Sequence, residues 1–338
     1  MKKYLLPNQG NFYKANLHMH TTISDGKMTV EEVKKAYLEK GYSIVAFTDH
    51  ELMVPHNDLT DDNFLAITST EIIIDQGIEK DWAFNKTYHL NLYSEEKNKN
   101  IFSTFDKRII WFKDYEQYIS EEQDKICYQR EYNIDAVNKV IQLAKDEKCL
   151  VSFNHPVWSL QNYSDYIGLK GLWGVEWLNG ACTRMGYYDT MQPIDDLLRM
   201  GEKVFPLATD DAHNIDDCFR GFVMVKANKL EYDDVYEALE KGNFYSSSRP
   251  EIKELYIEDN VLYIKTSPAR QIYFTTDRRY TRSYNSENEL LTEASLDLSN
   301  FIKYSTLQED KHCYIRVSVV DEHGYEAHTR AYFLEELM

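Results

Sequence analysis

The sequence predicts an α/β fold followed by a smaller all-β region. Apolar runs typical of buried strands recur through residues 1–250, and a helix signal separates the first two of them. After Pro250 the pattern changes to short strands whose side chains alternate between apolar and polar. We therefore expect an α/β domain over residues 1–250 and a small β-sandwich accessory domain over residues 251–338.

The first predicted strand runs into residues 16–25, where one residue separates His18 from His20. Side chains at positions i and i+2 of a strand lie on the same face, so both imidazoles can bind one metal ion. Asp25 follows a short turn and can reach a neighbouring ion. A His-x-His pair alone is a weak signal for a metal site, so the prediction depends on the ligands that follow.

A helix signal comes next, because Thr29 is a candidate N-cap and Glu32 stands three residues later, as in a capping box. The following apolar run, residues 43–47, leads to His50. In such strand–helix–strand units, ligands gather at the carboxyl ends of the strands. His50 is therefore expected to join the histidine pair of the first strand.

The same pattern recurs later in the chain, where apolar runs contain or precede further potential ligands. These are residues 64–68 before Glu71, residues 88–93 with His89, residues 149–153 before His155, and residues 203–208 before Asp211 and His213. Imidazoles mixed with carboxylates suit zinc, manganese or iron, and the lack of cysteine at these positions argues against a closed structural zinc site. Nine candidate ligands are too many for one ion. We expect a cluster of two or three divalent ions with carboxylates as bridges.

Several short segments of the chain are more informative together than any one of them is alone. They are His18-Met19-His20, Asp25-Gly26, Thr48-Asp49-His50, Glu71, residues 89–93, Asn154-His155-Pro156 and Asp211-Ala212-His213. In this order they resemble the PHP (polymerase and histidinol phosphatase) family of metal-dependent phosphoesterases. Residues 174–179, 220–225 and 242–251 look like the bacterial two-domain subgroup often labelled CehA-like. The resemblance implies a distorted (β/α)7 barrel with metal ions at the carboxyl ends of its strands.

The resemblance also implies which residues bind each ion. His18, His20, Glu71 and Asp211 would bind the first ion, Asp25, His50 and His213 the second, and Glu71, His89 and His155 the third. Asp210 could take the role given to Asp211. The spacing Asp-x-His favours Asp211, because positions i and i+2 share a face of an extended segment, and Asp210 would then point away or support a ligand.

A metal cluster of this kind suits hydrolysis of a phosphoester bond in a small phosphorylated substrate by a metal-activated water. The predicted catalytic residues are Glu71 as the bridge between ions, Arg184 and Arg220 as cations that hold the phosphate, and His56 as an acid for the leaving group. Each arginine could equally pair with a structural carboxylate.

Two other functions stay open beside a metal-dependent phosphoesterase. Metal-dependent amidohydrolases also begin with His-x-His in a barrel, but they commonly bridge two ions with a carboxylated lysine. No lysine follows a comparable strand end in this chain. A non-catalytic binding or regulatory protein on a PHP scaffold is the third possibility, and the complete set of ligands argues against it.

Composition limits the partners of the protein. The chain of 338 residues carries a formal net charge of −18, which disfavours long nucleic acids and anionic membranes. A small anionic substrate stays possible, because bound cations reverse the sign of the charge locally.

Three features of the sequence bear on the location of the protein in the cell. The amino terminus lacks a secretory signal, no run of about 18 apolar residues occurs, and five widely spaced cysteines indicate reduced thiols. We expect a cytoplasmic protein, and its oligomeric state stays open.

Residues 94–133 are rich in charged and aromatic side chains and are too many for a plain loop. They predict a partly helical insertion. Such a segment either covers the barrel with an extra helix or forms a lid or wall of the substrate site.

Overall fold

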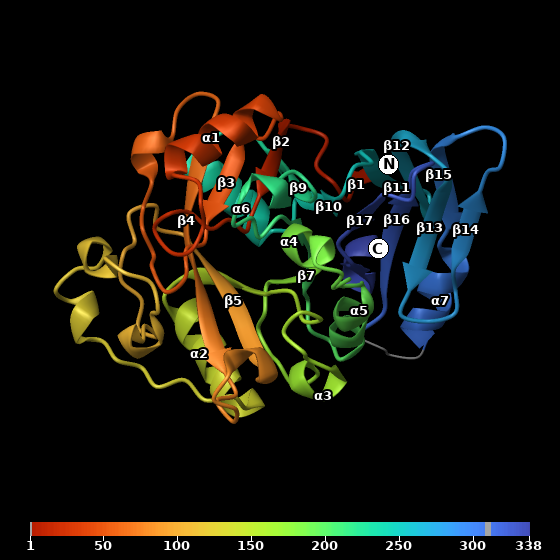
Figure 1. Ribbon diagram of the computed structural model, residues 1–338. Coiled ribbons are helices and arrows are strands. Elements are labelled where there is room, and N and C mark those ends of the chain that lie inside the picture. Colours follow the sequence, from red (N-terminus) through yellow and green to blue (C-terminus); the bar gives the residue numbers. More distant parts are fainter. Residues whose placement is uncertain (1, 308–311) are drawn as a thin grey trace.

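The computed structural model describes residues 2–307 and 312–338 and is a mixed α/β protein with a β-rich carboxyl-terminal part. Figure 1 shows the two parts side by side, with both marked chain ends on the β-rich part. None of the helices described is long and apolar enough to cross a lipid bilayer.

One large mixed sheet runs through both parts of the molecule. Its strands, in order across the sheet, are β14 (Arg282–Asn285), β13 (Gln271–Thr276), β16 (Tyr314–Val320), β17 (Glu326–Thr329), β10 (Phe244–Ser247), β9 (Phe222–Ala227), β2 (Asn11–Asn16), β3 (Ile44–Phe47), β4 (Leu65–Asp75), β5 (Thr87–Ser94), β6 (Cys149–Phe153), β7 (Gly174–Asn179) and β8 (Phe205–Thr209), with β18 (Tyr332–Phe333) paired to β16. Strands β2, β3 and β4 are parallel to one another, and so are β6, β7 and β8. Since β5 is antiparallel to both β4 and β6, the two parallel sets point the same way. Their carboxyl ends therefore lie at one edge.

The two ends of this parallel series meet at the carboxyl edge. Met19, just beyond β2, and Ala212, just beyond β8, form a parallel bridge, and the Asp211 N–H donates to the His18 carbonyl oxygen at 2.9 Å. The path of paired strands is otherwise open from β14 to β8 in the residues that the structure describes. The closed (β/α)7 barrel implied by the resemblance therefore stays a prediction.

Strand β5 departs from a regular alternation of parallel strands and helices. The connection between β4 and β5, residues 76–86, contains only the 3-10 turn η2 (Trp82–Phe84). A parallel crossover needs a dozen or more residues, usually with a helix, so a connection this short returns the chain antiparallel. The reversal brings the first residues of β5, including His89, back beside the second half of β4.

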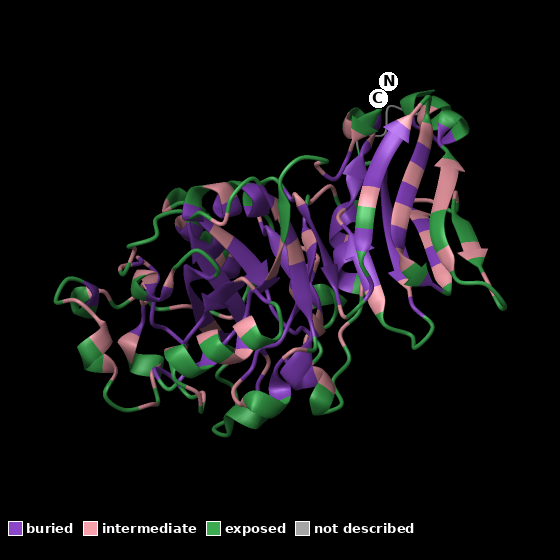
Figure 2. Ribbon diagram, turned by 90° about the horizontal axis from the view of Figure 1, so that it is seen from above, coloured by how far each residue is buried: buried purple, intermediate pink, exposed green. Residues whose placement is uncertain are grey.

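The helices lie outside the sheets, and Figure 2 shows buried strands inside and helices with exposed outer faces. They are α1 (Val30–Glu39), α2 (Ile134–Asp146), α3 (Tyr163–Tyr166), α4 (Gly180–Arg184), α5 (Gln192–Arg199), α6 (Tyr232–Glu240), α7 (Ser299–Leu307) and α8 (Leu334–Leu337). The predicted start of the first helix is confirmed. Glu32 N–H donates to the Thr29 side chain, and Thr29 N–H donates to the Glu32 carboxylate at 2.9 Å, which satisfies two N–H groups that the helix itself leaves free.

A second, smaller sheet stands beside the large one in the carboxyl-terminal part. Its strands, in order, are β1 (Lys3–Tyr4), β11 (Ile252–Glu258), β12 (Val261–Ala269) and β15 (Leu291–Asp297). Asp259 and Asn260 connect β11 to β12 in a hairpin turn with φ angles of 51° and 63°, which suits two-residue turns of this kind. Leu262 of the small sheet and Val317 of the large sheet share one apolar core. Because β1 pairs with β11, the amino-terminal strand joins this part, and the boundary at residue 250 stays a prediction.

The insertion between β5 and α2 holds short 3-10 turns and, in the described chain, no covering α-helix. Its turns are η3 (Lys107–Ile109), η4 (Tyr115–Tyr118) and η5 (Gln123–Lys125); the other two 3-10 turns outside η2 are η1 (Asn57–Leu59) and η6 (Ile215–Asp217). Phe102 and Phe105 are buried in the same core cluster as α2. The insertion is thus attached to the α/β part through its own apolar side chains.

Candidate metal centre

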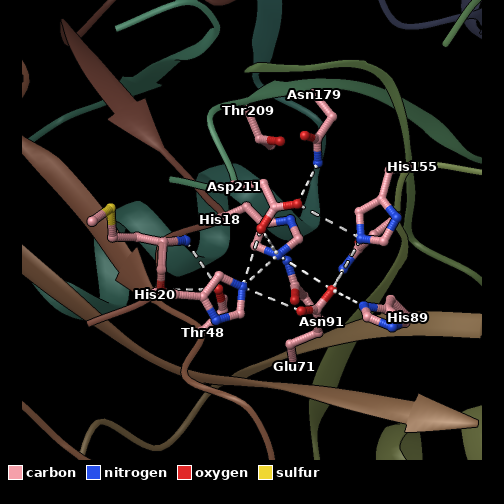
Figure 3. A network of polar contacts seen from close by, with 12 residues as sticks. His18, His20, Thr48, Glu71, His89, Asn91, His155, Asn179, Thr209 and Asp211 are labelled. Carbon is pink, nitrogen blue, oxygen red and sulfur yellow. Dashed lines mark hydrogen bonds and ion pairs between the residues drawn. The ribbon is translucent and has the colours of Figure 1, made fainter. Parts of the chain in front are cut away.

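The nine candidate ligands lie together at the carboxyl edge of the parallel strands. Figure 3 shows His18, His20, His89 and His155 directed toward Glu71 and Asp211. Three groups have ligand atoms within 4.8 Å of one another: His18, His20, Glu71 and Asp211; His20, Asp25, His50 and His213; and His50, Glu71 and His89. Residues shared between groups mean that the three potential ion positions adjoin.

These groups resemble the predicted ligand sets with two differences. The first group has the residues expected for the first ion, and the second adds His20 to those expected for the second ion. The third contains His50, whereas the resemblance implies His155 there. His155 still lies close, with its Nε2 3.4 Å from Oε1 of Glu71.

Glu71 occupies the middle of the cluster, and its two carboxylate oxygens face different histidines. Oε1 lies 3.2 Å from Nε2 of His18 and 3.2 Å from Nδ1 of His89. Oε2 lies 3.2 Å from Nε2 of His20 and 3.3 Å from Nδ1 of His50. A carboxylate placed in this way can bind two cations, one with each oxygen.

Several buried atoms of the cluster lack a hydrogen bond to any residue that the structure describes. They are Nδ1 of His20, Nδ1 of His50 and Oδ1 of Asp211. Buried polar atoms are rarely left without a partner in native proteins, because each costs free energy. Imidazole nitrogens and carboxylate oxygens are also the donors that divalent zinc, manganese and iron prefer. The residues therefore fit a cluster of metal ions.

Buried carboxylate and hydroxyl groups orient the histidine rings. Glu176 Oε1 accepts from Nδ1 of His18 at 2.8 Å, and its other oxygen accepts from the His155 backbone N–H at 2.9 Å. Ser159 Oγ lies 3.1 Å from Nδ1 of His155. A partner on Nδ1 fixes the ring so that Nε2 faces the cluster, as is usual for histidines that bind metals. Glu176 therefore supports two of the candidate ligands, His18 and His155.

Side-chain amides and a second aspartate hold the carboxylates. Asn154 Nδ2 donates to Oε1 of Glu71 at 2.8 Å, and Asn179 Nδ2 donates to Oδ2 of Asp211 at 3.0 Å. Asp49 accepts hydrogen bonds from the backbone and hydroxyl groups of Thr21 and Ser24, between 2.7 and 3.2 Å. Asp49 thereby fixes the loop that carries the next potential ligand, Asp25.

The structure distinguishes the two neighbouring aspartates after β8. Asp211 reaches the cluster, with Oδ1 3.1 Å from Nε2 of both His18 and His20. Asp210 points away, and its carboxylate accepts from the Tyr37 hydroxyl at 2.7 Å and from backbone N–H groups of residues 219–221. Asp211 adopts a positive φ of 50°, a conformation uncommon outside glycine that persists where surrounding structure enforces it.

The cluster forms part of the wall of a cleft with a volume of about 780 Å³. The other predicted catalytic residues do not line this cleft. Arg184 donates from Nε to Asp217 at 2.6 Å, and Arg220 donates to the Asp216 carbonyl oxygen. His56 is buried against the ring of Phe47. The geometry therefore gives no support to phosphate-holding roles for the two arginines or to an acid role for His56.

Carboxylates favour the protonated forms of His18 and His20 while no metal is bound. Burial lowers the pKa of His20, but its close contacts with the charged carboxylates of Asp211 and Glu71 outweigh burial and raise that pKa to about 10. Burial also lowers the pKa of His18, and the neighbouring carboxylates, Asp211 first, raise it well above its usual value. Metal ions bind the deprotonated rings, so they must displace these protons.

We therefore expect the affinity for Mn²⁺ to rise with pH. Each displaced proton adds about tenfold in affinity per pH unit as long as the pH is below the pKa of the histidine that loses it. With a pKa of about 10 for His20, this rise covers the whole neutral range. Calorimetric titration from about pH 6 to about pH 8, in buffers of different ionisation enthalpy, measures both the affinity and the protons released. An affinity independent of pH would contradict the expectation.

Comparisons with known proteins agree with the ligand pattern. A model of the PHP domain family matches residues 16–271. A curated relative, the DNA polymerase/3'-5' exonuclease PolX of Bacillus subtilis (strain 168), is 49% identical over 37 residues, which are 11% of this chain and 6% of that protein. The chain thus spans only a small part of this relative.

The solved structures to which this chain is similar are distant in sequence. A two-domain protein of Bacteroides vulgatus that contains a predicted PHP-like metal-dependent phosphoesterase is 14% identical, with 98% of this chain and 97% of that chain covered and a TM-score of 0.43. The lesion-specific endonuclease PfuEndoQ of Pyrococcus furiosus is 16% identical, with 68% and 56% covered and a TM-score of 0.42. Neither similarity bears on the substrate of this chain.

Proposed function

The chain belongs to the PHP domain family, and we propose that it is a hydrolase that uses two or three divalent ions to cleave a phosphoester bond in a small substrate. The observation that carries this proposal is the convergence of nine imidazole and carboxylate side chains in one cluster with Glu71 in its middle, with buried ligand atoms left without hydrogen bonds in the described chain. Zinc, manganese and iron are the candidate ions.

Divalent ions bound at such a cluster would lower the pKa of a coordinated water and neutralise charge on a phosphoryl group. The residues of this chain supply position and orientation. Glu71 presents one oxygen to each of two histidine sets, and Glu176 holds the ring of His18. Asp25 and His213 lie at the more exposed side of the cluster, with their side chains 28% and 33% exposed. This is the side from which a substrate can approach.

A hydrolase of neutral esters or amides is the second candidate, and one observation favours it. Among the described residues, no lysine or arginine lines the cleft. Arginine and lysine are the side chains that commonly hold phosphate groups in enzymes. In this chain the bound ions alone would have to neutralise a phosphate, whereas a neutral ester needs no such cation.

A panel of substrates tests the proposal against this alternative. The protein is loaded separately with Mn²⁺, Zn²⁺ and Fe²⁺ and assayed with small phosphomonoesters, phosphodiesters, carboxylic esters and amides. We expect phosphoester hydrolysis that stops when the metal is removed by a chelator and returns when it is added back. Hydrolysis of amides or carboxylic esters with no activity on phosphoesters would favour the second candidate. A protein that retains no metal would instead support a non-catalytic role.

A further inference from the structure

Aromatic and apolar side chains from four separate segments surround the candidate metal centre. They are Trp82 from the β4–β5 connection, Ile109 and Trp111 from the insertion, Trp158 and Leu160 from the segment after β6, and Met185 and Tyr187 from the segment after α4. Trp82 is 67% exposed and Trp111 is 55% exposed. Exposed apolar side chains that gather around a cleft mark a binding surface, because solvent would otherwise favour polar residues there.

Two of the tryptophans contact the histidines of the cluster itself. The ring of Trp111 lies 4.9 Å from that of His50, and the ring of Trp158 lies 5.1 Å from that of His155 and 5.4 Å from that of His89. Trp111 therefore flanks the second group of ligands, and Trp158 lies beside the third. A group attached to a phosphate held at the cluster would therefore lie close to these indole rings.

Trp82 lies beside Trp158, on the side away from the histidines. We call Trp82, Trp111 and Trp158 together the tryptophan wall. The ring of Trp82 lies 6.2 Å from that of Trp158, at an interplanar angle of 31°. Trp82 makes no ring contact with a histidine among the contacts of the described chain. Each of these two neighbouring indoles offers an aromatic face to a planar ring, and stacking on such a face contributes beyond the burial of area.

The insertion that carries Trp111 is held next to the cluster by a buried ion pair. Arg130 donates to both carboxylate oxygens of Glu51 at 2.6 Å, and also to the carbonyl oxygens of Ile73 and Thr104. Both charged side chains are almost fully buried. Glu51 directly follows the candidate ligand His50, so the position of the wall is tied to that of the cluster.

The charge of the cleft limits the substrate to few phosphate groups. Beyond the candidate ligands, the charged side chain that lines the described cleft is Asp75. Proteins that bind strands of nucleic acid combine aromatic stacking with a positively charged groove that follows the backbone. Here the bound ions would accept one phosphoryl group, and any further phosphate would face indole rings or a carboxylate.

We propose that the substrate carries a single phosphoryl group linked to a planar apolar ring, which the tryptophan wall binds while the cluster acts on the phosphoester. This inference rests on the proposed function. The cleft volume of about 780 Å³ accommodates a ligand of that size.

Two esters with similar leaving groups test the inference. (1-Naphthyl)methyl phosphate and cyclohexylmethyl phosphate are both esters of primary alcohols, and they differ in the planarity and the size of the ring. We expect the metal-loaded protein to prefer the naphthyl ester at least about tenfold in kcat/KM. Adenosine monophosphate and a thymidine dinucleotide serve as polar-ring and polyanionic probes, and both should be poorer substrates than the naphthyl ester.

A variant of the tryptophan wall tests whether this wall causes the preference for the naphthyl ester. Trp82→Leu should remove most of the preference for the naphthyl ester, because kcat/KM should fall about tenfold more for the naphthyl ester than for the cyclohexyl ester. Phe84→Leu is the matched control, because Phe84 lies in the same turn, is 72% exposed and does not line the cleft. Metal content is measured in every variant. It should not change in Trp82→Leu, because the ring of Trp82 contacts no candidate ligand ring in the described chain.

The outcomes separate this inference from the proposed function. Equal turnover of the two esters, or faster turnover of the dinucleotide, would overturn the inference and leave a phosphoesterase. If no phosphoester is cleaved, binding of (1-naphthyl)methylphosphonate is compared with binding of cyclohexylmethylphosphonate. Preferential binding of the naphthyl compound would then support ring recognition while the proposed function fails, and equal binding would overturn both.

Discussion

Replacing Glu71 with glutamine is expected to remove metal from two positions of the cluster and to lower turnover by more than about 100-fold. Glu71 is shared by two of the three ligand groups, and each of its oxygens faces a different pair of histidines. Glutamine keeps the shape but lacks the negative charge, so two neighbouring cations would repel each other with less compensation. Changes to groups that merely support a ligand already cost about 10–100-fold.

Two further variants control for this result. Asp75→Asn also removes one negative charge from strand β4 and from the lining of the same cleft, but Asp75 belongs to none of the described ligand groups. It should keep the full metal content. His50→Ala should empty the second position and weaken the third, because His50 belongs to those two groups, and should leave the first position filled.

Metal analysis and turnover of the folded variants test whether Glu71 bridges two ions. Circular dichroism establishes that each variant is folded before metal is counted. If Glu71→Gln retains the metal content and turnover of the unchanged protein, Glu71 does not bridge two ions. If Asp75→Asn loses as much metal as Glu71→Gln, the general charge of the cleft matters more than the ligand.

Much of the candidate site could be predicted from the sequence because its ligands follow local rules. Alternate residues of an extended segment share a face, which places His18 with His20 and favours Asp211 over Asp210. The carboxyl ends of parallel strands meet at one edge, which brings distant segments together. Glu71 was expected beyond the end of its strand, but it lies within β4, which continues to Asp75, because the apolar run at residues 64–68 showed only the first part of that strand.

The wall of the cleft could not be predicted in the same way. The insertion holds only short 3-10 turns in its described part, and such turns have no long apolar period from which the position of Trp111 could be predicted. The pair that anchors this segment joins Glu51 to Arg130, 79 residues apart. Neither local propensity nor spacing reports a contact of that kind.

The arginines illustrate a second limit of reasoning from sequence. A cation that follows a strand looks the same whether it faces a substrate or a structural carboxylate. Arg184 has such a carboxylate in Asp217, which the 3-10 turn η6 brings next to α4. Only the packing of two segments that are separate in the chain shows which partner it has.

The contact between the α/β part and the β-rich part is expected to be essential for stability. Strand β17 pairs with β10, so removing residues 251–338 would expose the backbone groups of a central strand. Asp195 of α5 and Arg316 of β16 form a buried ion pair across the same junction. Arg316 donates from Nε at 2.9 Å and from Nη2 at 2.7 Å, and the Tyr314 hydroxyl also donates to Asp195.

Arg316→Met is therefore expected to lower the free energy of unfolding by about 3–5 kcal/mol, because it leaves the buried carboxylate of Asp195 without its cation. Asp195→Asn combined with Arg316→Met should recover a large part of that loss, since neither charge is then buried. Lys203→Met is the matched control: Lys203 pairs with Glu335 at 2.7 Å near the same junction, but both side chains are more than half exposed. The free energy of unfolding should fall by less than about 1 kcal/mol in Lys203→Met.

Urea unfolding of the metal-free proteins measures these differences without a contribution from bound ions. A loss for Arg316→Met no larger than that for Lys203→Met would show that the buried pair does not stabilise the junction. A double variant that is less stable than Arg316→Met would show that hydrogen bonds to Asp195, and not its unpaired charge, determine the loss. If Arg316→Met loses the most unfolding free energy and the double variant recovers a large part of it, the two parts of the chain stabilise each other. The β-rich part then supports the metal centre by stabilising the α/β part, which carries all nine candidate ligands.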